Sequence, residues 1–506
     1  MTLTYLQNSL LPVNCCLVGW SALVDELSLA VPVRRMTCVS KDHVLGSHKE
    51  KDNWLIFDKR YTPEQGTIAH IAFALKHENI DLLILKKACE KIPASDFELF
   101  IKLTPTGAMA RKIWFFYEFL TGKRLNLPDA KVVTAVDVLN PKKYFTGKSV
   151  ISKRHRVRNN LLGSANFCPM VRRTAKLESF ITLGLENKAL TSIGHTNKQL
   201  ISRAASFMLL ADSRASFAIE GERPARNRIE RWGKVLLQAG KNTLDQVEIS
   251  RLHNILLGKS LFTDIGYRKD EVFLGERDHN NEPLPEFIGA HHQNLTNLMS
   301  ALFSCHENLL ESNVDAVIQA AIISFAFVYI HPLEDGNGRL HRFLIHHVLA
   351  AAKFSPAGII FPVSNVMLER IDEYKSVLQK HSAALMPFIQ WQLSNNYNVE
   401  LLNDTLALYQ YIDCTLEAEF LYDCVKKTIE VDLPKEINHL QAHDKAMVNI
   451  MTTIEMPDNV ARNLIMFVRQ NNGKLPIKRR VKEYSKLSDS EVVTIEKIIT
   501  SAFTEL

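Results

Sequence analysis

Residues 331–342 read HPLEDGNGRLHR and lie between two apolar stretches of the chain. Before them, residues 316–330 (AVIQAAIISFAFVYI) are mostly apolar but contain Gln319. Because this run is shorter than the roughly 20 residues of a membrane span, we interpret it as a buried core helix. After the segment, apolar residues recur at helical spacing as far as Val348. The stretch therefore predicts two helices joined by a polar loop.

The polar loop has the composition of a phosphate-binding site. Gly336 and Gly338 allow a tight turn that exposes backbone amides, and the N-terminus of the following helix carries partial positive charge. Arg339 and Arg342 project from the first turns of that helix, where two guanidinium groups suit a polyphosphate. We therefore expect the loop to bind the phosphates of a nucleotide.

Two further side chains supply the chemistry that such a site needs. Asp335 is a hard oxygen ligand for the magnesium ion that accompanies nucleotide phosphates. Of the loop residues 331–338, His331 is the one side chain that acts as a base near neutral pH. Together they predict nucleotidyl or phosphoryl transfer to a hydroxyl without a covalent enzyme intermediate. The alternative interpretation is a capped helix junction with a structural histidine.

The segment resembles the signature of the Fic family, H-P-F-x-[D/E]-G-N-[G/K]-R-x-x-R, and departs from it at Leu333, where Phe is usual. Leu still supplies an apolar anchor under the loop. The resemblance implies an all-helical core, ATP as substrate, His331 as base and Asp335 on Mg²⁺. It places further residues on the phosphates: Asn337 with the loop amides, and Arg339 and Arg342 on the outer phosphates.

The residue at position 338 bears on the type of reaction. Members with Gly at this position resemble AMP transferases, whereas the Doc-type members that phosphorylate their targets have Lys there. Gly338 therefore implies transfer of AMP from ATP to a Ser, Thr or Tyr hydroxyl of a target protein or of the chain itself.

A second motif lies about 110 residues upstream, where Ser216 to Gly221 match the family's inhibitory pattern [S/T]-x-x-x-E-[G/N]. By resemblance, Glu220 is the inhibitory residue, as in the class with an N-terminal inhibitory helix. A carboxylate paired with Arg342 would occupy the site of the γ-phosphate, so that ATP binds unproductively. The alternatives are an ordinary helix end at Gly221 and the reverse reaction, AMP removal, with Glu220 positioning water.

Two further assignments rest on resemblance. Residues 266–275 (GYRKDEVFLG) alternate in a β-prone pattern and resemble the hairpin flap that holds a target segment by strand addition. We expect docking at Val272, Phe273 and Leu274. Tyr374 resembles a family tyrosine near the adenine pocket, although a buried aromatic residue on a helix is commonly part of the core.

The chain of 506 residues is long enough for about three domains. We expect a mixed α/β region at 1–190 of unknown role, a Fic domain with its inhibitory helix at 197–400, and a helical or winged-helix tail at 401–506. Residues 187–196 are the expected linker. In the first region, the β-prone runs are 54–57, 82–85 and 132–139, and one helix is expected to start at Thr104–Pro105 and end at Gly122. The predicted fold class is thus mainly α, a helical Fic core with a β-hairpin flap between these two flanking regions.

Composition narrows the functional classes. With 46% hydrophobic and 23% charged residues the chain is typical of globular proteins, and its net charge of +6 does not by itself favour a nucleic-acid or membrane partner. The eight cysteines form no C-x-x-C pair, and the N-terminus has no secretory pattern, so we expect reduced core thiols and a cytoplasmic location. A homodimer is left open.

The tail suggests a second function. The basic run 478–482 (KRRVK) precedes a helix whose Ser488 and Glu491 form a capping-box pattern, an arrangement compatible with a helix-turn-helix. The alternative function is therefore a DNA-binding regulator whose Fic core senses ATP or modifies the chain itself. Salt-sensitive duplex binding that is lost when Arg479 and Arg480 become Ala would favour it.

Overall fold

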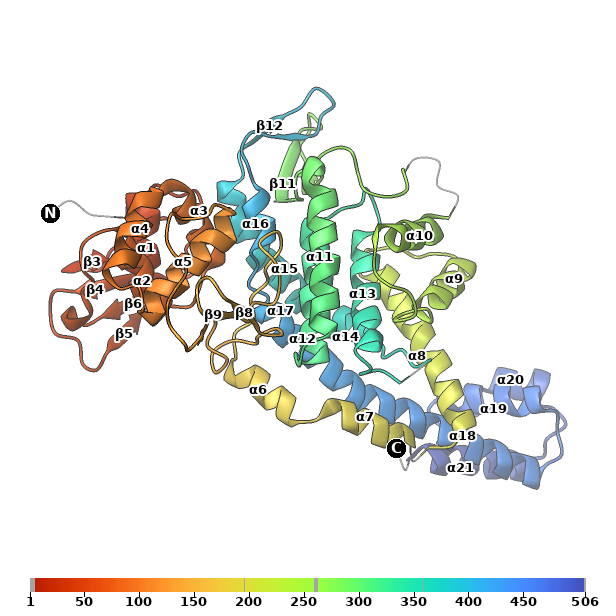
Figure 1. Cartoon of the computed structure of the whole chain (residues 1–506). Helices are drawn as coiled ribbons and strands as arrows, with labels where there is room; N and C mark the ends of the chain where they lie inside the picture. The colour runs from red at the N-terminus through yellow and green to blue at the C-terminus, as the bar shows by residue number, and fades with distance from the viewer. Residues whose placement is uncertain (1–4, 195, 259–262, 357, 505–506) are drawn as a thin grey trace. The chain divides into compact units, whose positions relative to one another are not determined.

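The computed structural model describes residues 5–194, 196–258, 263–356 and 358–504 (Figure 1). Most of its regular structure is α-helix, and its strands form small sheets. The predicted fold class is confirmed: the chain is mainly helical, with strands in a mixed N-terminal region.

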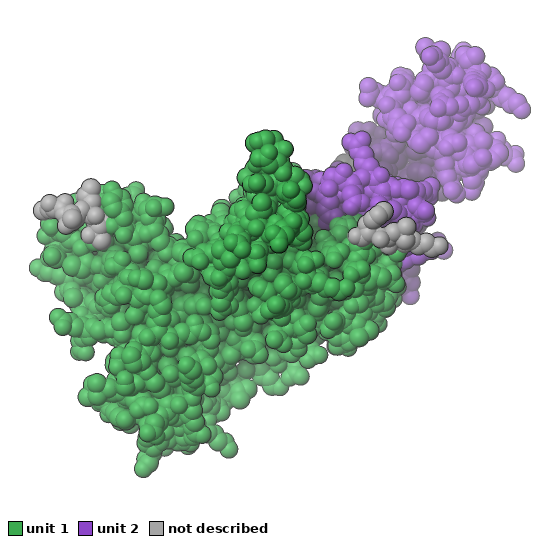
Figure 2. Space-filling model, turned by 90° about the horizontal axis from the view of Figure 1, so that it is seen from above, with its two compact units in different colours: residues 1–179, 238–353, 370–422 green, residues 180–237, 354–369, 423–506 purple. Residues whose placement is uncertain are grey.

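The chain divides into two compact units, which Figure 2 distinguishes by colour. Unit 1 contains residues 1–179, 238–353 and 370–422, and unit 2 contains residues 180–237, 354–369 and 423–506. Both units are discontinuous in sequence. The three predicted domain ranges stay predictions.

The N-terminal part of unit 1 contains a four-stranded sheet in the order β3-β4-β6-β5, in which β4 and β6 are parallel. Its strands are β3 (Cys15–Leu17), β4 (Met36–Ser40), β5 (His48–Lys51) and β6 (Trp54–Phe57), preceded by the hairpin β1 (Tyr5–Leu6) and β2 (Ser9–Leu10). The helices are α1 (Gly19–Glu26), α2 (Thr67–His77), α3 (Leu82–Lys91), α4 (Ala94–Leu103) and α5 (Ala108–Thr121), with a short η1 (Lys59–Tyr61).

Three local predictions in this part are wrong in detail. Residues 82–85 begin α3 instead of forming a strand, because the Asp81 side chain caps the helix by accepting hydrogen bonds from two backbone N–H groups at 3.0 Å. Thr104 ends α4, so α5 starts later than expected, at Ala108. Of residues 132–139, only Val136–Asp137 form a strand. The predicted strand at 54–57 and the end of α5 at Gly122, whose φ is 68°, are confirmed.

A second, three-stranded sheet follows in the order β7-β9-β8. Its strands are β7 (Val136–Asp137), β8 (Val150–Ser152) and β9 (Val157–Asn159). Arg154, from the basic run 153–158, forms an ion pair of 2.9 Å with Glu118 on α5, and both side chains are only 13% exposed. This part of the basic run therefore stabilises the fold.

The remainder of unit 1 is built around α12 (Ala316–Ile330), in which every residue from Val317 to Ile330 is buried. It packs against α11 (Leu295–Leu310) and α13 (Asn337–Ala351). The predicted core helix is therefore confirmed. The other elements are α10 (Gln246–Leu257), β10 (Phe273–Arg277), β11 (Pro283–Ile288), η2 (His292–Asn294), α15 (Ile371–Leu385), η3 (Met386–Phe388), β12 (Trp391–Leu393), β13 (Val399–Leu401), α16 (Leu406–Gln410) and α17 (Thr415–Lys427), whose last residues belong to unit 2.

Within unit 2, α8 (Lys198–Ala218) packs against α9 (Arg226–Leu236), α14 (Val363–Glu369) and α18 (Leu433–Thr453). The unit also contains most of the expected linker 187–196 as helix α7 (Leu185–Gly194), because its polar residues form one exposed helical side. The remaining elements are α6 (Ala175–Thr182), which begins in unit 1, η4 (Thr428–Asp432), α19 (Asp458–Gln470), α20 (Ile477–Glu483) and α21 (Asp489–Thr504).

The C-terminal helices have a core of their own, centred on Leu464, Ile465 and Ile495. The predicted capping box is confirmed: the Ser488 backbone N–H donates to the Glu491 carboxylate at 2.6 Å, and the Ser488 hydroxyl accepts from the Glu491 N–H at 3.3 Å. Every regular element described between residues 406 and 504 is a helix, so the tail takes the helical form.

None of the helices in the described ranges combines the length and apolarity that crossing a membrane requires. Six of the eight cysteines are buried, in agreement with core thiols: Cys38, Cys89, Cys168, Cys305, Cys414 and Cys424.

Candidate active site

His331 lies where α12 ends. Its backbone is left-handed, with φ 55° and ψ 60°, which is uncommon for a residue with a side chain and turns the chain sharply out of the helix. The side chain is 7% exposed, and its Nδ1 lies 3.1 Å from the carbonyl oxygen of Val328. Because a carbonyl can only accept, Nδ1 carries the proton and Nε2 keeps its lone pair. The helix end thus fixes the tautomer that a base needs.

Burial also sets the protonation state of this histidine. Desolvation, with a smaller contribution from the nearby Arg268 guanidinium, lowers the pKa of His331 to about 4, against the opposing effects of the Val328 carbonyl and Asp335. The imidazole is therefore neutral at pH 7. A neutral imidazole with an unprotonated Nε2 can accept a proton from a hydroxyl.

The loop after His331 is closed by the side chain of Asn337. Its amide oxygen accepts from the Leu333 N–H at 3.0 Å, and its amide nitrogen donates to the Leu333 carbonyl at 2.8 Å. Gly336 precedes α13 with φ 84°, and a Cβ at this position would lie 2.5 Å from Leu256. The left-handed backbone conformation therefore favours glycine there, and a Cβ would have to displace the end of the Leu256 side chain.

The charged side chains of the loop differ in exposure. The Asp335 side chain is 54% exposed and pairs with Arg339, whose Nη2 lies 3.0 Å from Oδ1. The side chains of Arg339 and Arg342 are both buried on the first turns of α13. Gly338, which directly precedes Arg339 in the chain, is half-buried. The structure thus brings the predicted base, carboxylate and two arginines together at the junction of α12 and α13. Glu334 is exposed and accepts from the Asp264 N–H at 3.1 Å.

A hairpin is present but lies further along the chain than predicted: its strands β10 and β11 are antiparallel, with Phe273 opposite Ile288, and of the expected stretch 266–275 only residues 273–275 are in a strand. It lies beside the loop, because the Ala290 N–H donates to the Ile330 carbonyl at 3.1 Å. Val272 and Phe273 are half-buried and Leu274 is exposed. Of the three expected docking residues, Phe273 and Leu274 therefore lie on the first strand of a hairpin anchored next to His331, and Val272 directly precedes that strand.

Two residues of this anchor were missed in the sequence. Arg268 is 4% exposed and donates to three backbone carbonyls, those of His331 (2.8 Å), Asp270 (2.6 Å) and Ala290. Gly289 lies so close that a Cβ would be 2.7 Å from Val272 and 3.1 Å from the His331 Cβ. The run of charges in residues 268–271 gave no sign that one arginine is buried.

Tyr374 is 4% exposed and lies in a group of aromatic rings. Its ring stacks on His341 at 6.0 Å and on Phe420 at 5.9 Å, and His341 is held by the Ser324 carbonyl at 2.7 Å from Nδ1. Desolvation lowers the pKa of His341 to about 3, which agrees with a structural histidine. A role of Tyr374 at the adenine stays a prediction.

The upstream motif ends α8 in unit 2. Ser216 is buried and Glu220 is exposed. The Glu222 N–H donates to the Phe217 carbonyl at 3.1 Å and the Gly221 N–H to the Ala218 carbonyl at 3.0 Å, with Gly221 at φ 73°. This is the Schellman pattern of a helix end, so the expected helix cap is present at the motif. The inhibitory role of Glu220 stays a prediction.

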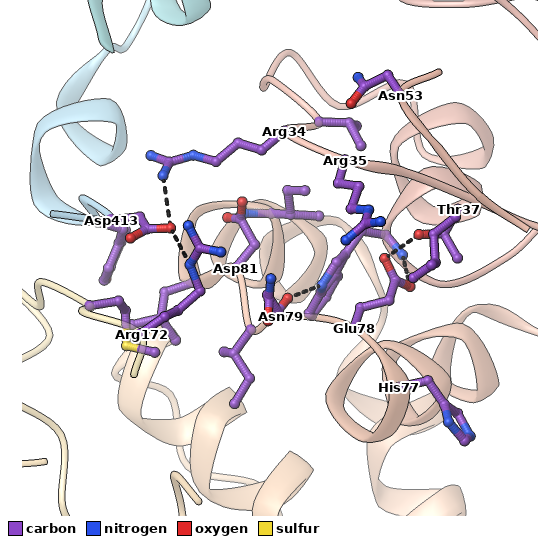
Figure 3. Close-up of a pocket in the computed structure, with 18 of the residues that line it drawn as sticks. Arg34, Arg35, Thr37, Asn53, His77, Glu78, Asn79, Asp81, Arg172 and Asp413 are labelled. Carbon is purple, nitrogen blue, oxygen red and sulfur yellow. Dashed lines mark hydrogen bonds and ion pairs between the residues drawn. The ribbon is translucent and has the colours of Figure 1, made fainter. Parts of the chain in front are cut away.

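A separate cavity of about 570 Å³ lies in unit 1, between the N-terminal sheet region and residues 170–172 and 411–413 (Figure 3). Its charged groups are largely paired with one another: Asp413 binds Arg34 at 3.1 Å and Arg172 at 3.3 Å. Glu78 accepts from the Thr37 hydroxyl at 2.8 Å and from the Trp20 N–H at 3.1 Å. These bonds give the cavity wall a structural role.

Burial of Glu78 makes the stability of this region depend on pH. Desolvation raises the pKa of its carboxyl to about 8, against the lowering effect of its two hydrogen bonds. The folded chain therefore keeps a proton that the unfolded chain releases near its usual pKa of 4.5. This stabilisation is complete below that pH and is lost as the pH rises through about 8.

Glu78→Gln is expected to flatten the fall in thermal stability between pH 5 and pH 9, because Gln occupies the same space and does not ionise. The Tm at pH 9 should rise by at least about 3 °C over the parent, the shift that about 1 kcal/mol gives in a domain of this size. Differential scanning calorimetry across this range measures it. Glu50→Gln, on the exposed rim, is the control, and an unchanged pH profile in Glu78→Gln would contradict the assignment.

Comparison with known proteins agrees with the geometry at the α12–α13 junction. Residues 243–349 match the Fic/DOC family. The chain is 30% identical over 145 residues to a protein from Nematostella vectensis and 23% identical over 237 residues to one from Drosophila melanogaster, both named protein adenylyltransferase Fic. These matches cover 28% and 45% of this chain, and 30% and 39% of the two relatives, so less than two thirds of either relative is represented.

Among solved structures, the chain is similar to a Fic family protein from Desulfovibrio desulfuricans, with 17% identity, a TM-score of 0.36, and coverage of 64% of this chain and 84% of that one.

The family match includes α10, the hairpin, α11, α12, the loop 331–336 and nearly all of α13. Residues 243–349 of this chain are therefore a Fic domain.

Proposed function

We propose that this chain transfers AMP from ATP to a Ser, Thr or Tyr hydroxyl of a target protein or of the chain itself, in the cytoplasm. The observation that carries the proposal is His331, a buried neutral imidazole whose Nδ1 is held by Val328 at the mouth of a loop of the Fic type. The relatives named protein adenylyltransferase support the same reaction.

In the proposed step, Nε2 of His331 takes the proton of the acceptor hydroxyl. The hydroxyl oxygen forms a bond to the α-phosphorus, and the bond between the α-phosphorus and the bridging oxygen breaks, so that pyrophosphate leaves. The N-terminus of α13 with Gly336 and Gly338 would hold the phosphates, and Arg339 and Arg342 would neutralise the outer ones. Asn337 would contribute by keeping the loop in shape.

Magnesium fits the carboxylate of Asp335, because that side chain is a hard oxygen donor and is exposed beside the proposed phosphate site. When bound, the ion would neutralise phosphate charge. Its pairing partner Arg339 is buried on the first turn of α13, so this ion pair holds the carboxylate next to the N-terminus of that helix.

Asp335→Ala is expected to lower transfer more than about tenfold at limiting magnesium, because it removes the carboxylate assigned to the metal. Glu334→Ala is the matched control and should be mild, since Glu334 is exposed and bonds to Asp264 outside the loop. A magnesium titration with α-labelled ATP measures both variants. The reverse order of effects would show that the wrong carboxylate has been assigned.

The β10–β11 hairpin is the proposed docking surface for the target. Its first strand carries Phe273 and Leu274, Val272 directly precedes it, and Arg268 anchors this end of the hairpin to the backbone of His331. An extended target segment added to this strand would lie beside the base. The shape of the hairpin thus favours a protein substrate over a small molecule.

We also propose that Glu220 restrains transfer by pairing with Arg342 and excluding the γ-phosphate. The support is the motif Ser216 to Gly221 and the exposed carboxylate of Glu220 at the end of α8. If Glu220 instead positions water, the same site would remove AMP. Labelling of the chain itself and of a cell extract with α-labelled ATP, followed by incubation without ATP, tests transfer and distinguishes it from removal.

DNA binding by the tail stays the second proposal. One observation favours a surface role: α20 carries the basic run 478–482, and its apolar residues Ile477 and Val481 are 81% and 70% exposed. Arg480 is partly used within the tail, since it pairs with Asp489 at 2.7 Å. A homodimer also stays a proposal.

A further inference from the structure

Three side chains with metal-binding atoms lie close together at the open end of the hairpin, where β10 begins and β11 ends. Glu271 precedes β10, and His291 and His292 follow β11. Strand pairing continues past β11, because the Gly289 N–H donates to the Val272 carbonyl at 3.0 Å. Glu271 is therefore brought opposite the two histidines, although about 20 residues separate them in sequence.

The distances between these side chains are short. Nδ1 of His292 lies 2.9 Å and Nδ1 of His291 lies 3.5 Å from Oε1 of Glu271. The two imidazole rings stack, with centroids 4.6 Å apart and planes at 25°, so both histidines turn to the same side of the chain. One ligand atom from each of the three residues lies within 4.8 Å of the other two.

The other carboxylate oxygen gives a second, independent observation. The Glu271 side chain is only 8% exposed, and within the described residues its buried Oε2 accepts no hydrogen bond. It faces the Arg268 guanidinium in an ion pair of 3.6 Å, which is longer than a hydrogen bond. The buried carboxylate therefore keeps unused acceptor capacity beside this one cation.

The backbone around the cluster is already fixed. Arg268 donates to the Asp270 and Ala290 carbonyls on the two sides of the hairpin, and the Asn398 amide donates to the Glu271 carbonyl at 2.8 Å. Binding of an ion at Nδ1 of His291 would replace the hydrogen bond that this nitrogen accepts from the Gln293 N–H at 3.2 Å. The three side chains therefore stand on anchored backbone, and little ordering would be needed to bind an ion.

From this geometry we propose that Glu271, His291 and His292 form a binding site for a divalent transition-metal ion, with Zn²⁺ as the best fit. Two imidazole nitrogens and one carboxylate oxygen are a zinc ligand set, and imidazole excludes Mg²⁺ and Ca²⁺ as preferred ions. Zinc places ligands at about 2.0–2.2 Å, so the side chains need only small rotations to close on the ion. The site is separate from Asp335 and does not depend on the proposed transfer reaction.

A bound ion would join the start and the end of the hairpin. Glu271 lies next to Val272, and Ala290, which precedes His291, is bonded to Ile330 just before His331. The ion would therefore hold β10 at a fixed position relative to the loop of the Fic domain. It would also slow the opening of the hairpin, because three ligands must be released before the strands can separate.

The test is titration of Zn²⁺ into the full chain by isothermal calorimetry, after chelator treatment and without nucleotide. The parent should bind one Zn²⁺ at this site, and Glu271→Gln and His292→Ala should each weaken that binding at least about 10- to 100-fold. His279→Ala is the matched control, because His279 is exposed on the turn of the same hairpin and should leave binding unchanged. Far-ultraviolet circular dichroism of each variant confirms folding.

Two further readouts make the result decisive. With Co²⁺ in place of Zn²⁺, the parent and His279→Ala should show visible absorption from nitrogen-coordinated cobalt, and His292→Ala should not. Amide exchange of residues 272–288 should slow on Zn²⁺ addition only in proteins that bind. The proposal is overturned if the parent binds no Zn²⁺, or if Glu271→Gln and His292→Ala both bind as tightly as the parent does.

Discussion

Replacing His331 with alanine is expected to reduce AMP transfer at least about 100-fold while ATP affinity and the free energy of unfolding stay close to those of the parent. General bases contribute factors of this size to proton transfer. The imidazole is expected to contact the acceptor proton and not the phosphates, so the chemical step should fail and binding should persist. His279→Ala, at an exposed histidine of the hairpin, should behave like the parent.

The pH dependence adds a second readout to this experiment. Since the pKa of His331 lies at about 4, the base is unprotonated from pH 9 down to pH 5, and its contribution to the rate should fall only as the pH drops through about 4. Initial rates with α-labelled ATP across this range measure it. Incorporation of label by His331→Ala at the parent rate would show that this histidine is not the base.

Glu220→Gly is expected to increase AMP transfer roughly 10- to 150-fold. A charge-assisted pair is worth about 1.5 to 3 kcal/mol, which corresponds to this factor if the orientation of ATP limits the rate. Removing the carboxylate should free Arg342 for the γ-phosphate and align the α-phosphate with the incoming hydroxyl. A time course with α-labelled ATP, following both self-labelling and labelling of a cell extract, measures the increase.

Three companion variants test the cause. Ser216→Ala should have a smaller effect. Glu220→Gly combined with Arg342→Ala should lose the gain, because the benefit passes through that guanidinium. Glu222→Gly, two residues further on in the same helix end, should leave the rate unchanged. If Glu220→Gly is no faster than the parent by either readout, the motif is only a helix end and the chain is an unregulated transferase or an AMP-removing enzyme.

The sequence predicted the helix-loop-helix around residues 331–342 because that signal is local. A nearly continuous apolar run, too short to span a membrane, indicated the core helix 316–330, and two glycines with charged neighbours identified the loop. The hairpin was predicted for the same reason, from period-two alternation near Val272. Each of these features depends on residues close together in the chain.

Features that depend on distant residues were not predictable in this way. The start of α3 was missed for a different reason: residues 82–85 are all buried, so their apolar run has no period, and the signal for a helix is the adjacent Asp81 cap. Arg268 looks like one more surface charge in RKDE, but its role comes from three carbonyls up to 63 residues away. Gly289 is required by contacts with Val272 and His331 that only the folded chain creates.

The pairing of residues 168–170 with residues 410–412 has a consequence for how the chain is made. The Cys168 N–H donates to the Gln410 carbonyl at 2.9 Å, and the Met170 N–H to the Ile412 carbonyl at 2.8 Å, so unit 1 gains its last partners only after residue 412 has left the ribosome. Until then the apolar surface of α12 lacks part of its final cover, since α12 also packs against α16. Between the synthesis of residue 330 and that of residue 412, the nascent chain therefore exposes apolar surface, and we expect chaperones to bind it during this interval. Fragments that stop at the end of the Fic domain, near residue 349, should for the same reason be poorly soluble when expressed alone.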